Sequence, residues 1–119
     1  MSTSQTNPRH GEIWLVDFDP ARGDEIQKTR PAIVLSLDSM GKLKLKLVAP
    51  LTGWQLDFSG NVWHMKLSPS HRNGLSRVSA VDLLQLRGVD ISRFSNKLGE
   101  LSEPEMEEVL ARLGLVVGA

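Results

Sequence analysis

The sequence lacks cysteine altogether, which excludes disulfide bonds, thiolate nucleophiles and zinc–thiolate sites. It also lacks a long apolar run, since none approaches the roughly 18 residues that a membrane span requires. Residues 1–10 are polar and contain no apolar stretch of the kind that a signal peptide needs. We therefore expect a soluble, cytoplasmic protein in which residues 1–10 form a flexible segment.

Residue patterns for metal and nucleotide chemistry are missing as well. The histidines, His10, His64 and His71, are scattered, and none stands in an H-x-x-x-H or similar arrangement. No glycine-rich phosphate loop follows an expected strand, and G-x-S-x-G is absent. These absences argue against nucleotide hydrolysis and against a bound metal ion or cofactor.

Length and charge indicate an ordinary globular chain. The 119 residues fit one domain, which we place at residues 11–119. The net charge is zero, but residues 100–119 hold five glutamates against Arg112 and carry −4, which leaves +4 on residues 1–99. A mildly basic body can meet phosphates, and an ordinary solvated surface would show the same balance.

Alternation and turn signals predict a chain made mostly of short strands. Strands are expected at residues 12–18, 31–37, 42–48 and 62–67, with one long or two short strands within 75–89 and long loops at 21–29 and 49–60. In the segment at 42–48, Lys42, Lys44 and Lys46 face one side and the intervening leucines face the other. The lysines are most simply solvent-facing or edge residues, and the alternative is a stripe that tracks phosphates.

Three local signals predict details of the fold. Trp14 in the first expected strand should lie in the core. Asn73-Gly74 is a residue pair typical of tight turns. Residues 90–94 are expected to form one helical turn.

A different pattern predicts a helix at the end of the chain. Ser102 and Glu105 form an S-x-x-E capping box, and Leu101 and Met106 can form a hydrophobic staple across it. The apolar positions that follow recur at helical spacing: Met106, Val109, Leu110 and Leu113. We expect the helix to end at Gly114. The sequence thus predicts a mainly β fold, a small curled antiparallel sheet or barrel with one C-terminal helix on one side.

Charged residues gather in and just after the loop at 21–29. Asp24, Glu25, Lys28 and Arg30 fall within seven residues, and Pro31 restricts Arg30 to extended backbone conformations. A guanidinium held in this way suits a phosphate group or the charge that develops at a reacting phosphorus centre. The alternative is an ordinary ion pair between Arg30 and Glu25 or Asp24.

The same region carries a longer pattern. Gly11-Glu12-Ile13-Trp14 is followed by Asp19-Pro20, then by Gly23-Asp24-Glu25 and by Arg30-Pro31-Ala32-Ile33-Val34-Leu35-Ser36. In this order and spacing the segments resemble the MazF/PemK (Kid) toxins of bacterial toxin–antitoxin systems. Weaker matches follow at residues 48–52, 73–75, 85–87 and 98–102, so the resemblance covers nearly the whole chain from Gly11 to Gly114.

This resemblance implies an SH3-like small barrel of the CcdB/MazF/Kid type, with a C-terminal helix, that acts as a homodimer. It implies a metal-independent, sequence-selective endoribonuclease that cleaves single-stranded mRNA by attack of the ribose 2′-hydroxyl on the adjacent phosphate. It also implies a cognate antitoxin protein that blocks the RNA groove, with operator DNA bound only as a complex with that antitoxin. Neither a cofactor nor a membrane takes part in this activity.

The resemblance also implies the roles of individual residues. Arg30 would stabilise the phosphate, Glu25 would act as the base, and Thr52 would bond a phosphate oxygen. The RNA-binding residues expected around them are Asp24, Gln27, Lys28, Trp54, Asp82, Gln85 and Arg87. Trp54 would stack on a base together with Phe58, or these aromatic residues would instead pin the loop at 49–60 or cover a dimer face.

Two positions depart from the family pattern. Ile26 stands where glutamine usually follows the loop glutamate, and Leu84 stands where many members carry an acidic residue before the position of Gln85. Asp82 would partly replace the missing carboxylate, or it is an ordinary solvated group. Leu84 leaves open a catalytically weak relative that binds antitoxin, RNA or operator DNA, and the shared barrel leaves open a CcdB-like toxin that binds DNA gyrase.

Overall fold

The computed structural model describes residues 7–40 and 43–119 of the chain. Most of the expected N-terminal segment, residues 1–6, and the expected strand residue Lys42 therefore lie outside the described residues. The last part of that segment is held to the domain. The backbone N–H of His10 donates to Asp38 Oδ1 over 2.8 Å, and Arg9 forms an ion pair with Asp38 at 3.0 Å.

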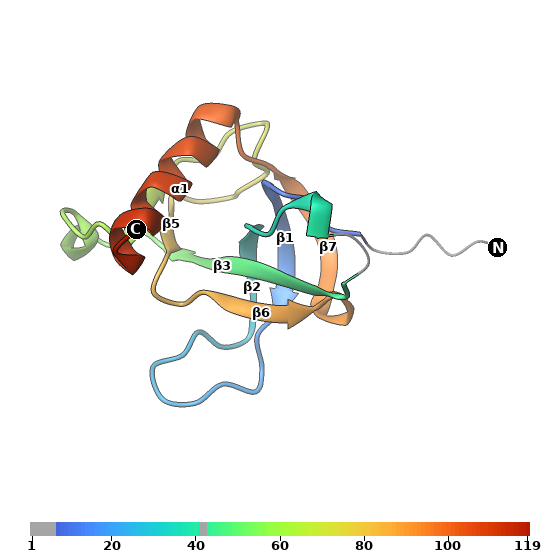
Figure 1. Ribbon diagram of the computed structural model, residues 1–119. Coiled ribbons are helices and arrows are strands. Elements are labelled where there is room, and N and C mark those ends of the chain that lie inside the picture. Colours follow the sequence, from blue (N-terminus) through green and yellow to red (C-terminus); the bar gives the residue numbers. More distant parts are fainter. Residues whose placement is uncertain (1–6, 41–42) are drawn as a thin grey trace.

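The described residues form a mainly β structure that ends in one α-helix (Figure 1). The strands are β1 (Glu12–Asp17), β2 (Thr29–Val34), β3 (Leu45–Gly53), β4 (His64–Leu67), β5 (Ser79–Asp82), β6 (Arg87–Asp90) and β7 (Phe94–Glu100), and the helix is α1 (Glu103–Val117). Short 3₁₀ turns lie at Asp38–Met40, Leu56–Phe58 and Ile91–Arg93, the last as expected from the sequence. The expected fold class is therefore confirmed.

The strands pair antiparallel in the order β4-β5-β3-β2-β1-β7, and β6 also pairs with β3. One edge of β3 changes partner along its length, because residues 45–48 pair with β6 and residues 51–53 pair with β5. Pro50, which has no backbone N–H to give to a ladder, lies where the partner changes. The sheet divides at β3 into two parts, and within the described residues no pairing joins β4 to β7 to close a barrel.

Two hydrophobic clusters pack on opposite faces of the sheet. Ile33 belongs to the first cluster, whereas its neighbours Ala32 and Val34 belong to the second, as the alternation of side chains along a strand requires. Met106 and Val109 of α1 are buried in the first cluster, so the helix covers that face. The second cluster consists of Val16, Phe18, Ala32, Val34, Val48, Val89 and Phe94.

Several strand bounds differ from the expectation. The first strand is confirmed, but the second begins at Thr29 and ends at Val34, so Arg30 lies within β2 rather than before it. The expected loop at 49–60 begins later, because β3 continues to Gly53. Residues 75–89 contain two separate strands, β5 and most of β6. The sequence pattern does not predict β7, because Phe94 is its one buried residue.

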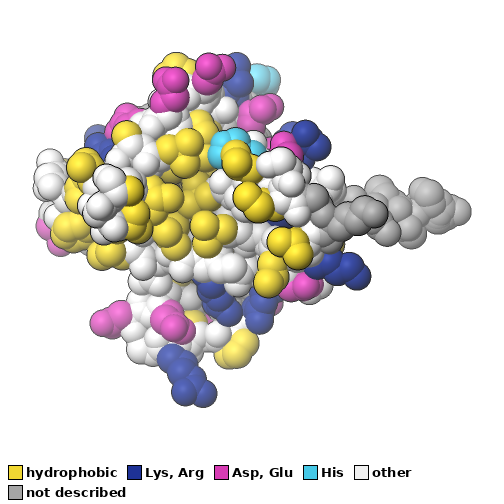
Figure 2. Space-filling view, viewed as in Figure 1, with side chains coloured by type: hydrophobic (Ala, Val, Ile, Leu, Met, Phe, Trp, Pro, Cys, Tyr) yellow, Lys and Arg dark blue, Asp and Glu magenta, His cyan; other side chains and the backbone are white. Residues whose placement is uncertain are grey.

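The alternation in β3 is confirmed, but its faces are opposite to the expectation. Lys46 is 7% exposed, whereas Leu43 and Leu45 are 62% and 60% exposed, so the solvent-facing interpretation is wrong for Lys46. The face of β3 that carries Leu51, a residue of the first cluster, continues toward the start of the strand as an exposed row. This row consists of Leu45 and Leu47, with Leu43 just before the strand, and we call it the leucine strip. Figure 2 shows apolar side chains gathered in this region, over β3 and beside α1.

The expected start of α1 after Ser102 is confirmed, and its expected end at Gly114 is wrong. Glu105 donates its backbone N–H to Ser102 Oγ over 3.3 Å, and its carboxylate accepts from the Ser102 N–H at 2.8 Å, which completes the capping box. The helix continues through Gly114 and ends at Gly118, whose φ of +78° is the left-handed conformation that glycine adopts without strain. No helix in the described part of the chain is long and apolar enough to cross a membrane.

Candidate active site

The loop between β1 and β2 projects from the body of the domain (Figure 1). Its two ends are joined at the neck: the backbone N–H of Phe18 donates to the carbonyl of Lys28 over 2.9 Å, and the Lys28 N–H donates to Asp19 Oδ1 over 2.9 Å. Lys28 has a φ of +70°, an uncommon conformation for a residue with a side chain. The neck therefore fixes the base of the segment that carries Asp24, Glu25 and Gln27.

Glu25 stands in a tight turn of this loop. Its carboxylate accepts a hydrogen bond from the backbone N–H of Arg22 over 2.7 Å, and its own N–H donates to the Arg22 carbonyl over 3.0 Å. The side chain lines a hollow of about 370 Å³ together with Leu84, Gln85 and Arg87. The position of the missing family carboxylate, Leu84, thus faces the same hollow as the expected base.

Arg30 is not engaged by a carboxylate. Its Nε donates to the carbonyl of Gln27 over 3.3 Å. Among the ion pairs of residues 7–40 and 43–119, none involves Arg30, Glu25 or Asp24. The alternative of an ordinary ion pair is therefore not what the structure contains.

The sheet register relates Arg30 to Thr52. β2 and β3 pair with Ala32 opposite Pro50 and Val34 opposite Val48. The same register, continued by two residues along both strands, places Arg30 opposite Thr52. Because residues at even steps share a face, both side chains emerge on the side of the second cluster. The two expected catalytic residues of the strands therefore both lie two positions beyond the last paired residues, Ala32 and Pro50, at the same end of β2 and β3.

Arg77 is a further arginine near Thr52. Both residues line a hollow of about 280 Å³. Leu51 and Leu75 of the first cluster also line it, so this hollow opens on the face of the sheet opposite to Arg30. The Arg77 guanidinium rests against Gly53, its carbon 3.4 Å from the place where a Cβ on that glycine would stand. None of the ion pairs in the described residues involves Arg77.

Three expected RNA-binding residues lie near each other but are occupied by contacts within the chain. Asp82 lies 3.7 Å from His64 Nε2 and accepts from the Leu84 N–H over 3.0 Å. Arg87 donates to the Phe18 carbonyl over 2.9 Å, and its guanidinium lies 6.0 Å from the ring centre of Phe18. Both side-chain groups of Gln85 bond the backbone of the β1–β2 loop.

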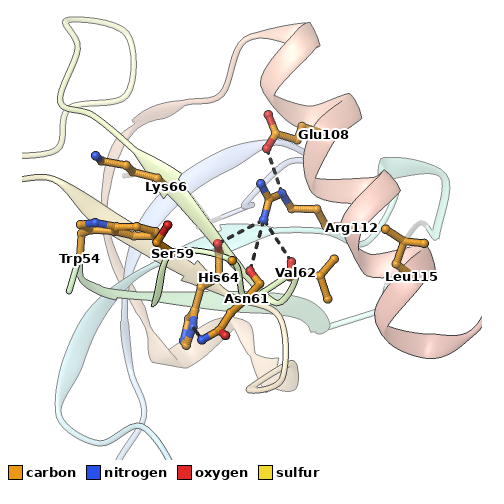
Figure 3. A pocket seen from close by; sticks show the side chains of 10 residues that line it. Trp54, Ser59, Asn61, Val62, His64, Lys66, Glu108, Arg112 and Leu115 are labelled. Atoms are coloured by element: carbon orange, nitrogen blue, oxygen red, sulfur yellow. Dashed lines mark hydrogen bonds and ion pairs between the residues drawn. The ribbon is translucent and has the colours of Figure 1, made fainter. Parts of the chain in front are cut away.

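Trp54 belongs to a separate and larger hollow of about 690 Å³ (Figure 3). Its ring meets Phe58 edge-on at 5.8 Å, and Phe58 stacks on His64 at 3.8 Å, so Phe58 pins its loop to β4. Lys66 Nζ stands 5.3 Å from the Trp54 ring centre. Arg112 of α1 closes the hollow by donating to the carbonyls of residues 61, 62 and 64.

Trp14 lies at the edge of the second cluster rather than fully inside it. Its ring packs edge-on against Phe94 at 6.0 Å, and its Nε1–H donates to Glu12 Oε1 over 2.9 Å. Trp14 is half-buried and packs against the second cluster, so the prediction that it lies in the core is only partly confirmed. Within the described ranges, no group of three or more His, Asp or Glu side chains is placed to hold a metal ion.

Comparisons with known proteins agree on one family. The sequence profile of the family described as PemK-like, MazF-like toxin of type II toxin-antitoxin system matches residues 9–117. The endoribonuclease toxin ChpB of Escherichia coli K12 is 34% identical over 110 residues, which is 90% of this chain and 91% of that protein. The crystal structure of MazF from Deinococcus radiodurans has a TM-score of 0.75 at 28% identity, with 98% of this chain and 100% of that chain covered. A MazE–MazF structure from the same organism has a TM-score of 0.70 at 28% identity, with coverages of 93% and 96%.

Proposed function

The chain belongs to the family of PemK-like, MazF-like toxins of type II toxin–antitoxin systems, and on this premise we propose that Arg30, Glu25 and Thr52 form its RNA-cleaving site. The protein is an endoribonuclease toxin of the MazF/ChpB type. One observation carries the assignment of the site. Among the described residues Arg30 forms no ion pair, and the register of β2 and β3, continued two residues beyond Ala32 and Pro50, leads to Arg30 and Thr52.

The proposed reaction is a transesterification within the RNA chain. The ribose 2′-hydroxyl gives its proton to the base and attacks the adjacent phosphorus. The bond from phosphorus to the 5′-oxygen of the next nucleotide breaks, and this oxygen takes up one proton from the solvent. The products are a 2′,3′-cyclic phosphate and a 5′-hydroxyl, and neither water nor a metal ion is consumed. Such a step needs a base at the 2′-hydroxyl, a proton for the leaving oxygen and positive charge at the phosphate.

Arg30 supplies the positive charge. Its Nε is engaged with the Gln27 carbonyl, which leaves the terminal guanidinium nitrogens for a phosphate. In this proposal the guanidinium of Arg30 stabilises the negative charge on the phosphate in the transition state and is not the proton donor. In this proposal the hydroxyl of Thr52 on β3 donates a hydrogen bond to a phosphate oxygen.

Glu25 acts as the base in this proposal. Its carboxylate is exposed and accepts one backbone hydrogen bond from Arg22, so lone pairs remain for the 2′-hydroxyl. Single-stranded RNA then passes from the loop residues Asp24, Gln27 and Lys28 over the end of β3. Beyond Thr52, Trp54 offers a ring face with Lys66 at 5.3 Å, which suits a stacked base and its phosphate. Since its substrate is mRNA, the proposed activity belongs to the cytoplasm.

A cleavage assay tests this assignment directly. Purified protein is incubated with an unstructured RNA in the presence of EDTA, and the ends of the fragments are identified. We expect 5′-hydroxyl and 2′,3′-cyclic phosphate ends, with Arg30→Ala lowering kcat by about 10²–10³-fold. Arg9→Ala is the matched control, because it removes an exposed arginine paired with Asp38 outside this site. Intact RNA with wild-type protein, or equal rates for wild type and Arg30→Ala, contradicts the proposal.

Leu84 favours a second candidate, a family member of low catalytic rate. This leucine is 63% exposed and faces the hollow that contains Glu25, so a carboxylate at its position would reach the same space. If the absent acidic group limits the rate, Leu84→Asp raises kcat above that of wild type. If Leu84→Asp is no faster than wild type, the missing acidic group does not limit the rate. If wild type cleaves RNA at a normal rate, there is no reason to regard it as a family member of low catalytic rate.

We propose that the protein is a homodimer that covers the leucine strip. These leucines continue the face of β3 that carries Leu51, and such an apolar surface is costly to leave in water. Light scattering tests the dimer: wild type should have twice the mass of the chain, and Leu45→Lys should have the monomer mass. Leu56→Lys, at a residue that is 91% exposed elsewhere, is the control. A monomeric wild type, or a dimer indifferent to Leu45→Lys, contradicts this surface.

A type II toxin has a cognate antitoxin, and MazE–MazF of D. radiodurans is a structure of the same fold. We propose that an antitoxin encoded beside this chain binds it, blocks the RNA path, and alone enables binding of operator DNA. Co-expression should yield a complex that leaves RNA intact, and removal of the antitoxin should restore cleavage. DNA gyrase supercoiling in the presence of the free toxin should be unchanged.

A further inference from the structure

The tip of the β1–β2 loop is tied to the rest of the chain by one side chain. The Gln85 carbonyl oxygen accepts from the backbone N–H of Ile26 over 3.1 Å, and its amide nitrogen donates to the carbonyl of Asp24 over 2.9 Å. In the part of the chain that the structure describes, these are the hydrogen bonds that join residues 20–27 to segments outside the loop and β2. Gln85 therefore holds the two residues on either side of Glu25, and we call this pair of hydrogen bonds the Gln85 grip.

Other contacts hold the neck of the loop but leave the tip to Gln85. Arg87 and Arg93 donate to carbonyls of residues 17–19, where the loop begins. The neck closes on itself through Phe18, Asp19 and Lys28. None of these bonds reaches Glu25, so the direction of its side chain depends on how the tip is held.

A local turn fixes the backbone position from which Gln85 bonds the loop. Asp82 Oδ1 accepts from the Leu84 N–H over 3.0 Å, and the Asp82 carbonyl accepts from the Gln85 N–H over 3.4 Å. The Asp82 carboxylate faces His64 across the β4–β5 ladder, which anchors the turn to the sheet. Gln85 thus projects from a fixed point toward the loop.

From this arrangement we propose that Gln85 is a positioning residue, which holds the Glu25 carboxylate in its reactive place before RNA binds. The inference rests on the proposed function of Glu25 as the base. A carboxamide is the side chain that gives one donor and one acceptor at this reach. A glutamate there would set a carboxylate against the Asp24 carbonyl, and a methionine of equal length would leave both backbone groups without a partner.

The expected kinetic result is a fall in kcat with little change in KM. Loss of the grip lets the tip adopt other conformations, and a displaced catalytic group lowers the rate by about 10–100-fold. RNA binding should persist, because Arg30, Thr52 and Trp54 stand on other segments. The preferred cleavage sequence should also persist, since the Gln85 amide is occupied by the loop and not by a base.

A double-mutant cycle tests whether Gln85 acts through Glu25. The kcat values of wild type, Gln85→Met, Glu25→Gln and the double variant are measured on a short RNA that carries the mapped cleavage site. We expect Glu25→Gln to cost much less in the Gln85→Met background than in wild type. Gln55→Met is the matched control, because Gln55 is exposed and its side chain caps nothing. Additive effects, or a changed cleavage sequence in Gln85→Met, overturn the proposal.

A measurement without RNA separates the grip from the chemistry. Hydrogen exchange of the Ile26 amide should speed up by at least about tenfold in Gln85→Met, with unchanged exchange in β3 as evidence of an intact fold. If the Ile26 amide exchanges at the same rate in wild type and Gln85→Met, Gln85 does not hold the loop tip, even if the variant cleaves RNA slowly. A wild type that leaves RNA intact contradicts the proposed function, and the Ile26 exchange still decides whether Gln85 holds the loop.

Discussion

Gly74 faces the carbonyl group of Leu98 so closely that a Cβ on Gly74 would overlap the Leu98 oxygen. Gly74 has a φ of +67°, and the turn before it is held by Asn73, whose buried side chain bonds the backbone of residues 68, 70 and 75. The expected Asn73-Gly74 turn is therefore confirmed. It packs directly on β7.

Gly74→Ala should destabilise the protein by roughly 2–4 kcal/mol, because the strained φ and the overlap with β7 add to each other. Gly99→Ala, whose Cβ would meet the carbonyl of Arg72, should act similarly. Gly88→Ala is the control, since space is open around it. Urea denaturation monitored by tryptophan fluorescence measures the three values, and equal stability of Gly74→Ala and Gly88→Ala would refute the close approach.

The Glu12–Lys97 ion pair, at 2.9 Å, should make stability depend on pH. Burial raises the pKa of Glu12, but the hydrogen bonds from Lys97 and Trp14 have a larger opposite effect. The pKa of Glu12 is therefore below its ordinary value. The hydrogen bond to Glu12 raises the pKa of Lys97. The contribution of Glu12 is therefore present above about pH 4.3 and is lost as pH falls through its lower folded pKa.

Glu12→Gln should lose about 1 kcal/mol of stability at pH 7, and the difference from wild type should shrink in strong acid. Lys97 makes stability depend on pH at the alkaline end. Because its pKa is raised in the folded state, its contribution to stability is present below about pH 10.4 and is lost as the pH rises through the folded pKa. Urea midpoints between pH 3 and pH 7 measure the acid limb. A difference that is constant over this range would contradict the ion pair as its source.

If RNA turns round the end of β3 at Thr52 and Gly53, Arg77 contributes one phosphate contact on the face opposite to Arg30. Arg77→Ala should weaken RNA binding and reduce the slope of log Kd against log salt by about 0.7, the change for one phosphate on a single strand. The check is a salt titration with a non-cleavable RNA in which the 2′-hydroxyl is blocked. Arg9→Ala should leave the slope unchanged, and an unchanged slope in Arg77→Ala would place this guanidinium outside the RNA path.

The two glycines near the end of α1 should respond in opposite directions to alanine. Gly114 stands inside the helix with open space at its Cβ position, so Gly114→Ala should stabilise by about 0.5–1 kcal/mol. Gly118 ends the helix at positive φ, so Gly118→Ala should destabilise by about 1 kcal/mol. Thermal denaturation compares them, and a loss of stability in Gly114→Ala would show that the helix ends earlier.

The sequence by itself determined the features that depend on near neighbours in the chain. The capping box of Ser102 and Glu105 and the turn at Asn73-Gly74 are made by groups within a few residues of each other, so their spacing is sufficient to predict them. The motif from Gly11 to Ser36 likewise identified the family, and from it came the proposed roles of Arg30 and Glu25, because that information is contained in the order of residues.

Only the tertiary structure decided which surfaces are covered and which distant residues meet. Alternation at residues 42–48 defines two faces of a strand, but only the tertiary structure decides that Lys46, opposite Val89 of β6, is buried and that Leu45 is exposed. The grip of Gln85 on Ile26 spans 59 residues, and no local pattern encodes a contact of that separation. The physical reason is that a side chain's partners depend on how strands far apart in the sequence are brought into register.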